Sequence, residues 1–113
     1  LVNSSNQMKI NREEIFGPIA AVILVADYDE ALQTANDADY GLSAGIITQD
    51  TKLQNHFIEN IEAGMAQINL PTAGMDFHTP FTGNKSSSFG PPEKSTYCRE
   101  FFTGYKVVHA ASI

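Results

Sequence analysis

The sequence has 113 residues, 42% of them hydrophobic, which suits one small domain with a packed core. Thirteen acidic against seven basic side chains give a formal charge of −6 without any Lys/Arg cluster, which argues against nucleic acid and anionic membrane surfaces as partners. No apolar run reaches the roughly 18 residues of a membrane span, and the single cysteine, Cys98, fits the reducing cytoplasm.

The first segment, residues 1–18, is polar and ends in the heptapeptide "REEIFGP". It begins at Leu1 without a basic n-region or an apolar h-region, so we expect no signal peptide and a chain that is already under way. The heptapeptide places two carboxylates beside an aromatic residue and then a Gly-Pro turn, immediately before an apolar run. Local structure alone explains only the turn.

Residues 19–69 predict an α/β arrangement of parallel strands with crossover helices. The run from 19 to 26 is apolar throughout, as in a strand that is buried on both faces of a parallel sheet. Asp27 and Glu30 have the spacing of a capping box, which predicts a helix over 28–38.

A turn at Gly41 and a short strand over 44–48 should follow. Asp50 or Thr51 then caps a second helix, in which Leu53, Phe57 and Ile61 recur at four-residue spacing. We expect Gly64 to end this helix as a C-cap and residues 65–69 to form another strand. Two right-handed crossover units result.

Residues 70–95, the pocket loop, contain four of the five prolines and several aromatic residues. Long ordered loops in compact domains are usually functional, so this loop is a candidate wall of a site. Residues 96–113 predict a short helix near 96–101 and then a strand that has no partner in a domain of this size. Such a strand needs a sheet edge, which another subunit can supply.

Five stretches in this order, "REEIFGP", "YGLSAGIITQD", "AGMAQIN", "PF.G.K.S" and "FFTGYKVV", resemble the C-terminal part of the NAD(P)-dependent aldehyde dehydrogenase superfamily. The pocket loop further resembles the subgroup that oxidises semialdehydes such as 2,5-dioxovalerate. The resemblance implies the fold of the C-terminal part of the catalytic domain. It also implies an oligomerisation strand over 102–110, and with it a homodimer or homotetramer.

The resemblance assigns cofactor contacts to Glu14 and Phe16 in the cofactor-contact segment, residues 1–18. In the family this Glu accepts hydrogen bonds from the nicotinamide ribose and the Phe packs beside it, with NAD or NADP as the cofactor. A carboxylate can accept from both hydroxyls of a diol, and an aromatic ring holds a flat ligand at little cost in rotamer entropy. Taken without the flanking motifs, Glu14 would be an ordinary solvated side chain.

The aldehyde tunnel of the family corresponds to the part of the pocket loop from 70 to 81, which assigns substrate contacts to Met75, Phe77 and Phe81. Phe77 could equally be a hydrophobic anchor for the loop. The family usually has Gly-Gly after the matching Phe, whereas this chain has Thr82-Gly83. This departure predicts either a strained backbone at Thr82 or a different loop arrangement.

The family's nucleophilic Cys, oxyanion-binding Asn and base Glu all lie upstream of the "EEIFGP" motif, so we expect no catalytic residue in this chain and no activity from it alone. Cys98 matches no nucleophile motif and is predicted to be buried and inert. The three histidines lack metal-ligand spacing, and "TGNKSSS" is displaced from a phosphate loop. The alternative function is a noncatalytic piece: a truncated or proteolytic fragment, or a strand-pairing module.

Overall fold

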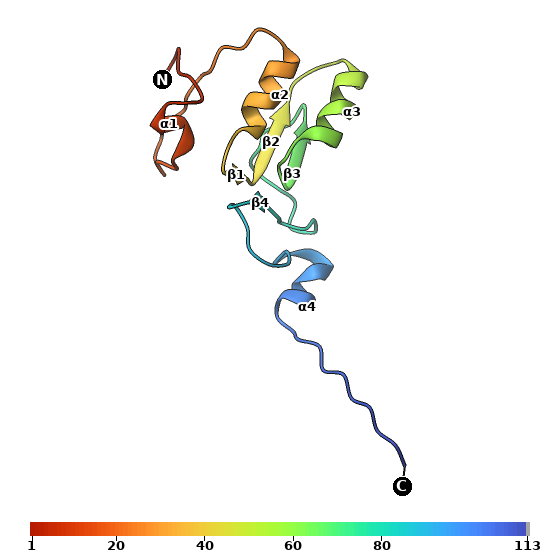
Figure 1. Ribbon diagram of the computed structural model, residues 1–113. Coiled ribbons are helices and arrows are strands. Elements are labelled where there is room, and N and C mark those ends of the chain that lie inside the picture. Colours follow the sequence, from red (N-terminus) through yellow and green to blue (C-terminus); the bar gives the residue numbers. More distant parts are fainter. Residues whose placement is uncertain (113) are drawn as a thin grey trace.

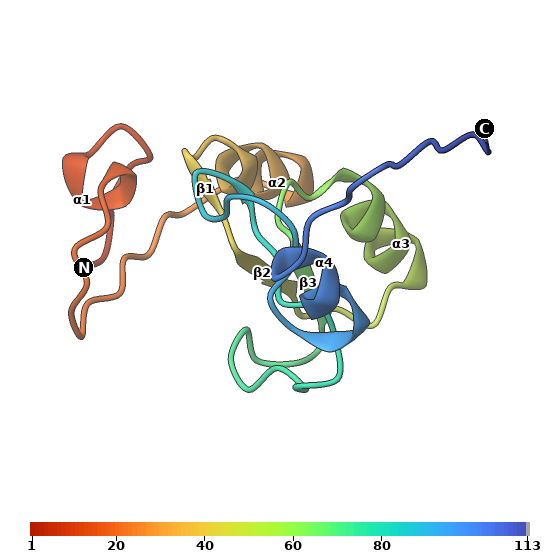
Figure 2. The same cartoon turned by 90° about the horizontal axis from the view of Figure 1, so that it is seen from below.

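Two helices and two parallel strands form the ordered body of the chain, of which the computed structural model describes residues 1–112. Helix α2 (Tyr28–Asn36) precedes strand β2 (Ser43–Ile46), and helix α3 (Thr51–Asn60) crosses over to strand β3 (Met65–Ile68). The strands pair in parallel, with Ser43 opposite Met65 and Ile46 opposite Ile68. In Figures 1 and 2 both helices lie on the same side of this small sheet.

The aspartates that the sequence predicts as caps start both helices. Asp27 Oδ1 accepts from the amide of Glu30 at 2.9 Å, while Glu30 Oε2 accepts from the amide of Ala26 at 2.6 Å. Asp50 Oδ1 accepts from the amides of the second and third residues of α3 at 2.8 and 3.4 Å. Both helices therefore begin where an acceptor satisfies their free amides, and Asp50, rather than Thr51, is the cap of α3.

The remaining elements are short. They are α1 (Lys9–Arg12), β1 (Tyr40–Gly41), β4 (Asn84–Lys85), a 3-10 helix (Ser95–Tyr97) and α4 (Cys98–Phe101). The last two confirm the short helix predicted near 96–101. Strands β1 and β4 pair antiparallel, with Tyr40 opposite Lys85. This pair, which the sequence does not predict, ties Asn84 and Lys85 of the pocket loop to the chain that leaves α2.

The buried apolar core among residues 1–112 is small: Phe57 of α3 and Met65 of β3 are 6% and 9% exposed. The radius of gyration is 18.8 Å, whereas a compact domain of this size would have about 13 Å. Figure 1 shows the cause in part, because the C-terminal residues run away from the body as an extended tail. The packed core expected from the composition is thus not closed within this chain.

The strand predicted over 19–26 is wrong. In this stretch the structure has one parallel bridge, between Ser4 and Ile23. The Ser4 amide donates to the Val22 carbonyl at 3.2 Å, and the Val22 amide donates to the Leu1 carbonyl at 2.8 Å. Leu24 is 75% exposed. A strand that is apolar on both faces needs strands beside it and helices over it. Here only the first residues of the chain lie alongside, so one crossover unit forms instead of two.

The predicted C-cap role of Gly64 is also wrong. Helix α3 ends at Asn60, and its C-cap Ile61 has an extended conformation. Gly64 is needed for close packing instead, because a Cβ at this position would lie 2.3 Å from the carbonyl oxygen of Thr82. The pocket loop therefore returns to the sheet directly over Gly64.

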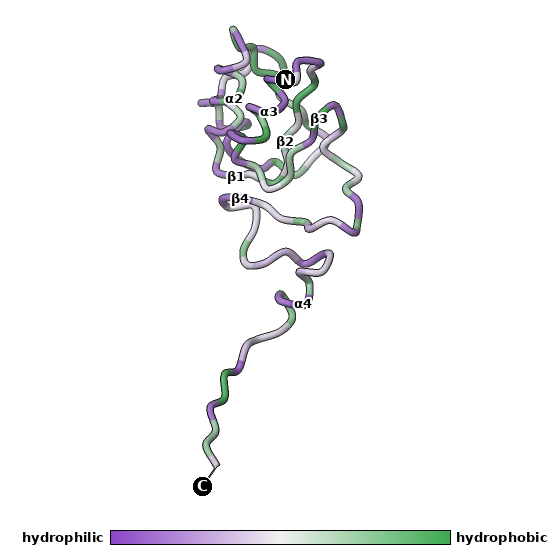
Figure 3. The backbone as a smooth tube through the Cα atoms, turned by 90° about the vertical axis from the view of Figure 1, so that its right-hand side faces the viewer, coloured by the Kyte–Doolittle hydropathy of each residue, from purple (hydrophilic) through white to green (hydrophobic). Residues whose placement is uncertain are grey.

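Thr82, which stands where the family usually has glycine, is not among the residues with positive φ, so its backbone carries no left-handed strain. Cys98 is half-buried rather than buried. Residues 103–112 have no regular secondary structure, and Figure 3 shows hydrophobic stretches in this tail. Among residues 1–112, every helix is too short or too polar to cross a lipid bilayer.

Candidate functional site

The "REEIFGP" heptapeptide begins with Arg12, the last residue of α1, and continues as an exposed turn. Glu13 has an extended backbone and ends α1, and the amide of Ile19 closes a turn on the carbonyl of Gly17 at 2.7 Å. Phe16 is 93% exposed and has a φ of 53°, which is rare for a bulky residue. Such a conformation costs on the order of 1–3 kcal/mol and persists mostly at functional positions.

Glu14 lines an open hollow of about 470 Å³ between the cofactor-contact segment and the β1–β4 pair. Phe16 is not one of its lining residues. The hollow is rich in carboxylates and hydroxyls, so it suits a ligand that donates hydrogen bonds, such as a sugar diol. Its lining residues are Asn11, Arg12, Glu13, Glu14, Tyr40, Gly41, Leu42, Ser43, Ser86 and Ser87.

The three predicted substrate contacts do not line one common pocket in the chain. Met75 lines a hollow of about 390 Å³, where its Sδ accepts from Nε2 of Gln67 at 2.7 Å. Phe81 lines a separate hollow of about 250 Å³, and Lys94 Nζ lies 4.9 Å from its ring centroid. Phe77 is 70% exposed and belongs to neither hollow. Their role in binding substrate stays a prediction.

A turn at Asp76 shapes the tip of the pocket loop. Asp76 Oδ1 accepts from both the amide and Nδ1 of His78 at 2.9 Å, and Thr79 Oγ1 donates to the Asp76 carbonyl at 2.8 Å. The backbone hydrogen bond from His78, followed by the side-chain one, holds the pKa of the Asp76 carboxyl below its usual value. The rings of Phe77 and His78 are in contact, with centroids 3.7 Å apart and planes tilted by 35°. His78 thus orders the tip of the pocket loop, a role that the spacing of the histidines does not predict.

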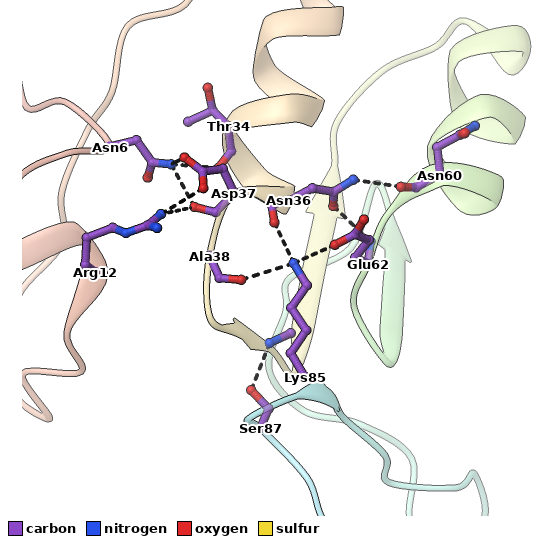
Figure 4. Close-up of polar contacts among 11 residues, drawn as sticks. Asn6, Arg12, Thr34, Asn36, Asp37, Ala38, Asn60, Glu62, Lys85 and Ser87 are labelled. Atoms are coloured by element: carbon purple, nitrogen blue, oxygen red, sulfur yellow. Dashed lines mark hydrogen bonds and ion pairs between the residues drawn. The ribbon is translucent and has the colours of Figure 1, made fainter.

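The end of α2 is the centre of a polar network that sequence reasoning missed (Figure 4). From one side, Arg12 Nη1 donates to the carbonyl of Asp37 and, at 3.1 Å, to its Oδ1. Asn6 Nδ2 donates to the same two groups at 2.8 Å. The Arg12 hydrogen bond, then that from Asn6, holds the pKa of the Asp37 carboxyl below its ordinary value of 3.8.

Lys85 approaches the turn at the end of α2, residues 36–38, from the side opposite Arg12 and Asn6 (Figure 4). Its Nζ donates to the carbonyl oxygens of Asn36 at 2.5 Å and Ala38 at 3.1 Å and lies 2.6 Å from Oε2 of Glu62. All three ammonium protons thus have partners. The "TGNKSSS" stretch therefore positions Lys85 at a helix C-terminus, where a cation interacts favourably with the free carbonyl groups. Because Lys85 is far from α2 in the sequence, no local sequence pattern indicates that it caps this helix.

The other chemically active side chains are not gathered into a site within residues 1–112. Tyr28 Oη and His56 Nδ1 lie 3.0 Å apart and join α2 to α3, and burial, followed by the charge of Asp29, raises the pKa of Tyr28. Cys98 is the first residue of α4. No group of three or more potential metal ligands occurs in the described part of the chain.

Comparison with known proteins adds a family to this geometry. The model of the "Aldehyde dehydrogenase family" matches residues 1–108. The chain is 47% identical to an alpha-ketoglutarate semialdehyde dehydrogenase of Haloferax volcanii over 103 residues, which are 90% of this chain and 21% of that protein. It is 42% identical to an alpha-ketoglutaric semialdehyde dehydrogenase of Bacillus subtilis over 94% of this chain and 22% of that protein.

Solved structures agree with the sequence matches. The aldehyde dehydrogenase KauB of Pseudomonas aeruginosa superimposes with a TM-score of 0.85 at 37% identity, over 93% of this chain and 21% of that one. An aldehyde dehydrogenase of Mycobacterium tuberculosis in complex with NAD+ gives 0.81 at 32% identity, over 94% and 23%. The chain thus spans about a fifth of the length of the relatives it matches.

Proposed function

The chain belongs to the aldehyde dehydrogenase family, as its motifs predict, and on this premise we propose that it is the C-terminal portion of an NAD(P)-dependent aldehyde dehydrogenase. The proposed enzyme oxidises an aldehyde or semialdehyde to a carboxylic acid in the cytoplasm. The observation that carries the proposal is the match over residues 1–108, which includes the cofactor-contact segment, the pocket loop and most of the tail.

The proposed cofactor contacts are Glu14 and Phe16, and the cofactor is NAD or NADP. The polar hollow beside Glu14 fits a ribose, since its carboxylate can accept from two hydroxyl groups at once. The exposed ring of Phe16, held in an uncommon backbone conformation, is free to pack against a flat ring. Solved relatives that contain NAD+ support a nicotinamide cofactor, which would accept a hydride from the substrate.

The proposed substrate is a semialdehyde, because the relatives include dehydrogenases named for alpha-ketoglutarate semialdehyde and 2,5-dioxopentanoate. Met75, Phe77 and Phe81 are the proposed pocket residues of this chain. Met75 and Phe81 line separate hollows in this chain. One common pocket therefore requires an opposing wall from another part of the enzyme. That wall, the nucleophilic Cys and the base Glu are proposed to lie outside this chain.

Exposed apolar surface supports a partner for this chain. In residues 19–26, Ile19, Val22 and Leu24 are 52%, 48% and 75% exposed, which is costly in water. We propose that the remainder of the enzyme covers this stretch. In the tail, Tyr105, Val107 and Val108 are 90%, 78% and 75% exposed, and residues 102–110 are proposed to pair with another subunit of a homodimer or homotetramer.

A chimeric enzyme tests the proposed function. Residues 1–113 replace the matching segment of the Haloferax volcanii relative, and reduction of NAD+ or NADP+ is followed with alpha-ketoglutarate semialdehyde as substrate. We expect aldehyde-dependent reduction that the 113-residue chain alone lacks. A folded chimera that binds the cofactor but never reduces it would instead favour a noncatalytic strand-pairing piece.

A further inference from the structure

The polar network at the end of α2 joins the two halves of the proposed site. Arg12 is two residues before Glu14 in the cofactor-contact segment. Lys85 is four residues after Phe81 in the pocket loop. Both cations bind the same short turn, residues 36–38, and they approach it from opposite sides (Figure 4).

The backbone between Phe81 and Lys85 is held tightly, so a shift at Lys85 is transmitted to Phe81. The carbonyl of Thr82 packs over Gly64, whose own amide donates to the carbonyl of Gly41 at 2.9 Å. The β1–β4 pair fixes Asn84 and Lys85. This stretch has little freedom to move independently of the turn that Lys85 binds.

Lys85 has a strained backbone conformation, and its ammonium group is fully bonded. Its φ is 52°, a left-handed conformation that costs a non-glycine residue on the order of 1 kcal/mol or more. Its side chain is 25% exposed, and its ammonium group has three oxygen partners. A surface lysine with no role beyond solubility needs neither feature.

The cofactor-contact side is attached by equally specific bonds. Arg12 donates to both the carbonyl and the carboxylate of Asp37, and Asn6 supports it at the same two groups. Asn36 connects the turn to the end of α3, since its Oδ1 accepts from the Glu62 amide at 2.9 Å and its Nδ2 donates to the Asn60 carbonyl at 2.8 Å. Residues 36–38 are thus held in place between the cofactor-contact segment and the pocket loop.

We infer that Arg12 and Lys85 are positioning residues that set the spacing between the cofactor-contact segment and the pocket loop. The inference rests on the proposed function, in which the cofactor-contact segment holds the nicotinamide end of the cofactor and the pocket loop lines the aldehyde site. Lys85 lines no part of the hollow beside Glu14, so its removal alters the alignment of the two reactants rather than the binding of either one. Arg12 also lines that hollow, so its removal alters the alignment and can change cofactor binding as well.

The kinetic test uses Lys85→Met and Arg12→Gln in the chimeric enzyme, because both replacements remove the charge and keep much of the length. We expect the single-turnover rate of hydride transfer per active site to fall about 10- to 100-fold, the scale of a misplacement of about 1 Å. The Kd of the cofactor should be unchanged in Lys85→Met, because Lys85 does not line the hollow beside Glu14, and this variant carries the test. Lys85→Arg should recover part of the rate. Lys52→Met is the matched control, since Lys52 forms no salt bridge within residues 1–112.

Rates equal to that of the Lys52→Met control, or a loss explained wholly by fewer folded molecules, would overturn the inference. A second measurement uses the chimeric enzyme and does not depend on activity. Spin labels on Phe16→Cys and Phe81→Cys, with all other cysteines of the chimera, Cys98 included, replaced by alanine, report the distance between the cofactor-contact segment and the pocket loop. Lys85→Met should broaden this distance distribution, and an unchanged distribution would contradict the spacing role. If the parent chimera were inactive and Lys85→Met still broadened the distance distribution, the proposed function would be refuted while the spacing role of Lys85 would stand.

Discussion

Replacing Gly64 with alanine should displace the pocket loop, because this glycine lies directly beneath it. The added Cβ would lie 2.3 Å from the Thr82 carbonyl oxygen and 2.7 Å from Gly83 Cα, whereas ordinary contacts begin at 3.4 Å. One backbone must therefore move by about 1.1 Å or more. Overpacking of this kind destabilises by about 1–3 kcal/mol. In the chimeric enzyme a shift of about 1 Å should lower kcat/KM for the aldehyde by about 100-fold.

Gly104→Ala is the matched control for stability, since nothing lies within 4 Å of a Cβ at that position. Urea unfolding of both variants, followed by circular dichroism, measures their stability. For the kinetics with the semialdehyde the control is the unsubstituted chimera, because residues 102–110 are proposed to pair between subunits. If Gly64→Ala has the unfolding midpoint of Gly104→Ala and the kcat/KM of the unsubstituted chimera, the close approach of the loop to Gly64 does not hold the site.

Three further predictions concern single carboxylates. Glu14→Gln should slow hydride transfer in single-turnover measurements on the chimera while leaving its circular dichroism unchanged; an unaltered rate together with an unaltered cofactor Kd would remove Glu14 from the site. Asp27→Ala should lower the free energy of unfolding by about 1 kcal/mol through loss of the N-cap of α2, and Asp29→Ala, which removes no capping bond, is its control in urea unfolding. Because the pKa of Asp37 is lowered in the folded chain, its stabilisation is present above the ordinary value of 3.8 and is lost as pH falls through the folded pKa. An acid titration of stability should therefore decline below about pH 4, and Asp37→Asn should flatten that decline.

The elements that local sequence specifies were predictable. Asp27 and Asp50 cap helices because each supplies an oxygen within reach of the free amides of its own first turn, and such a contact is visible in four consecutive residues. The parallel pairing of β2 with β3 also follows from the order of strand, helix and strand. The family followed from five motifs in one order, and the match over residues 1–108 confirms it.

The features that the sequence did not predict depend on contacts between distant residues. Lys85 is 49 positions from Asn36, so no local pattern predicts that its ammonium group caps α2. A glycine after a helix usually caps it, which predicts that role for Gly64, yet the close approach of Thr82 from another segment determines why a glycine is needed there. The run 19–26 has the composition of a buried strand, but composition does not supply the neighbours that bury it.

The rate of nicotinamide reduction by the chimera with alpha-ketoglutarate semialdehyde, measured in parallel with its Glu14→Gln variant, shows whether this chain completes an aldehyde dehydrogenase. We expect aldehyde-dependent reduction by the parent chimera and a slower hydride step in the variant. A folded, cofactor-binding chimera without aldehyde-dependent reduction would contradict the claim that this chain completes an aldehyde dehydrogenase.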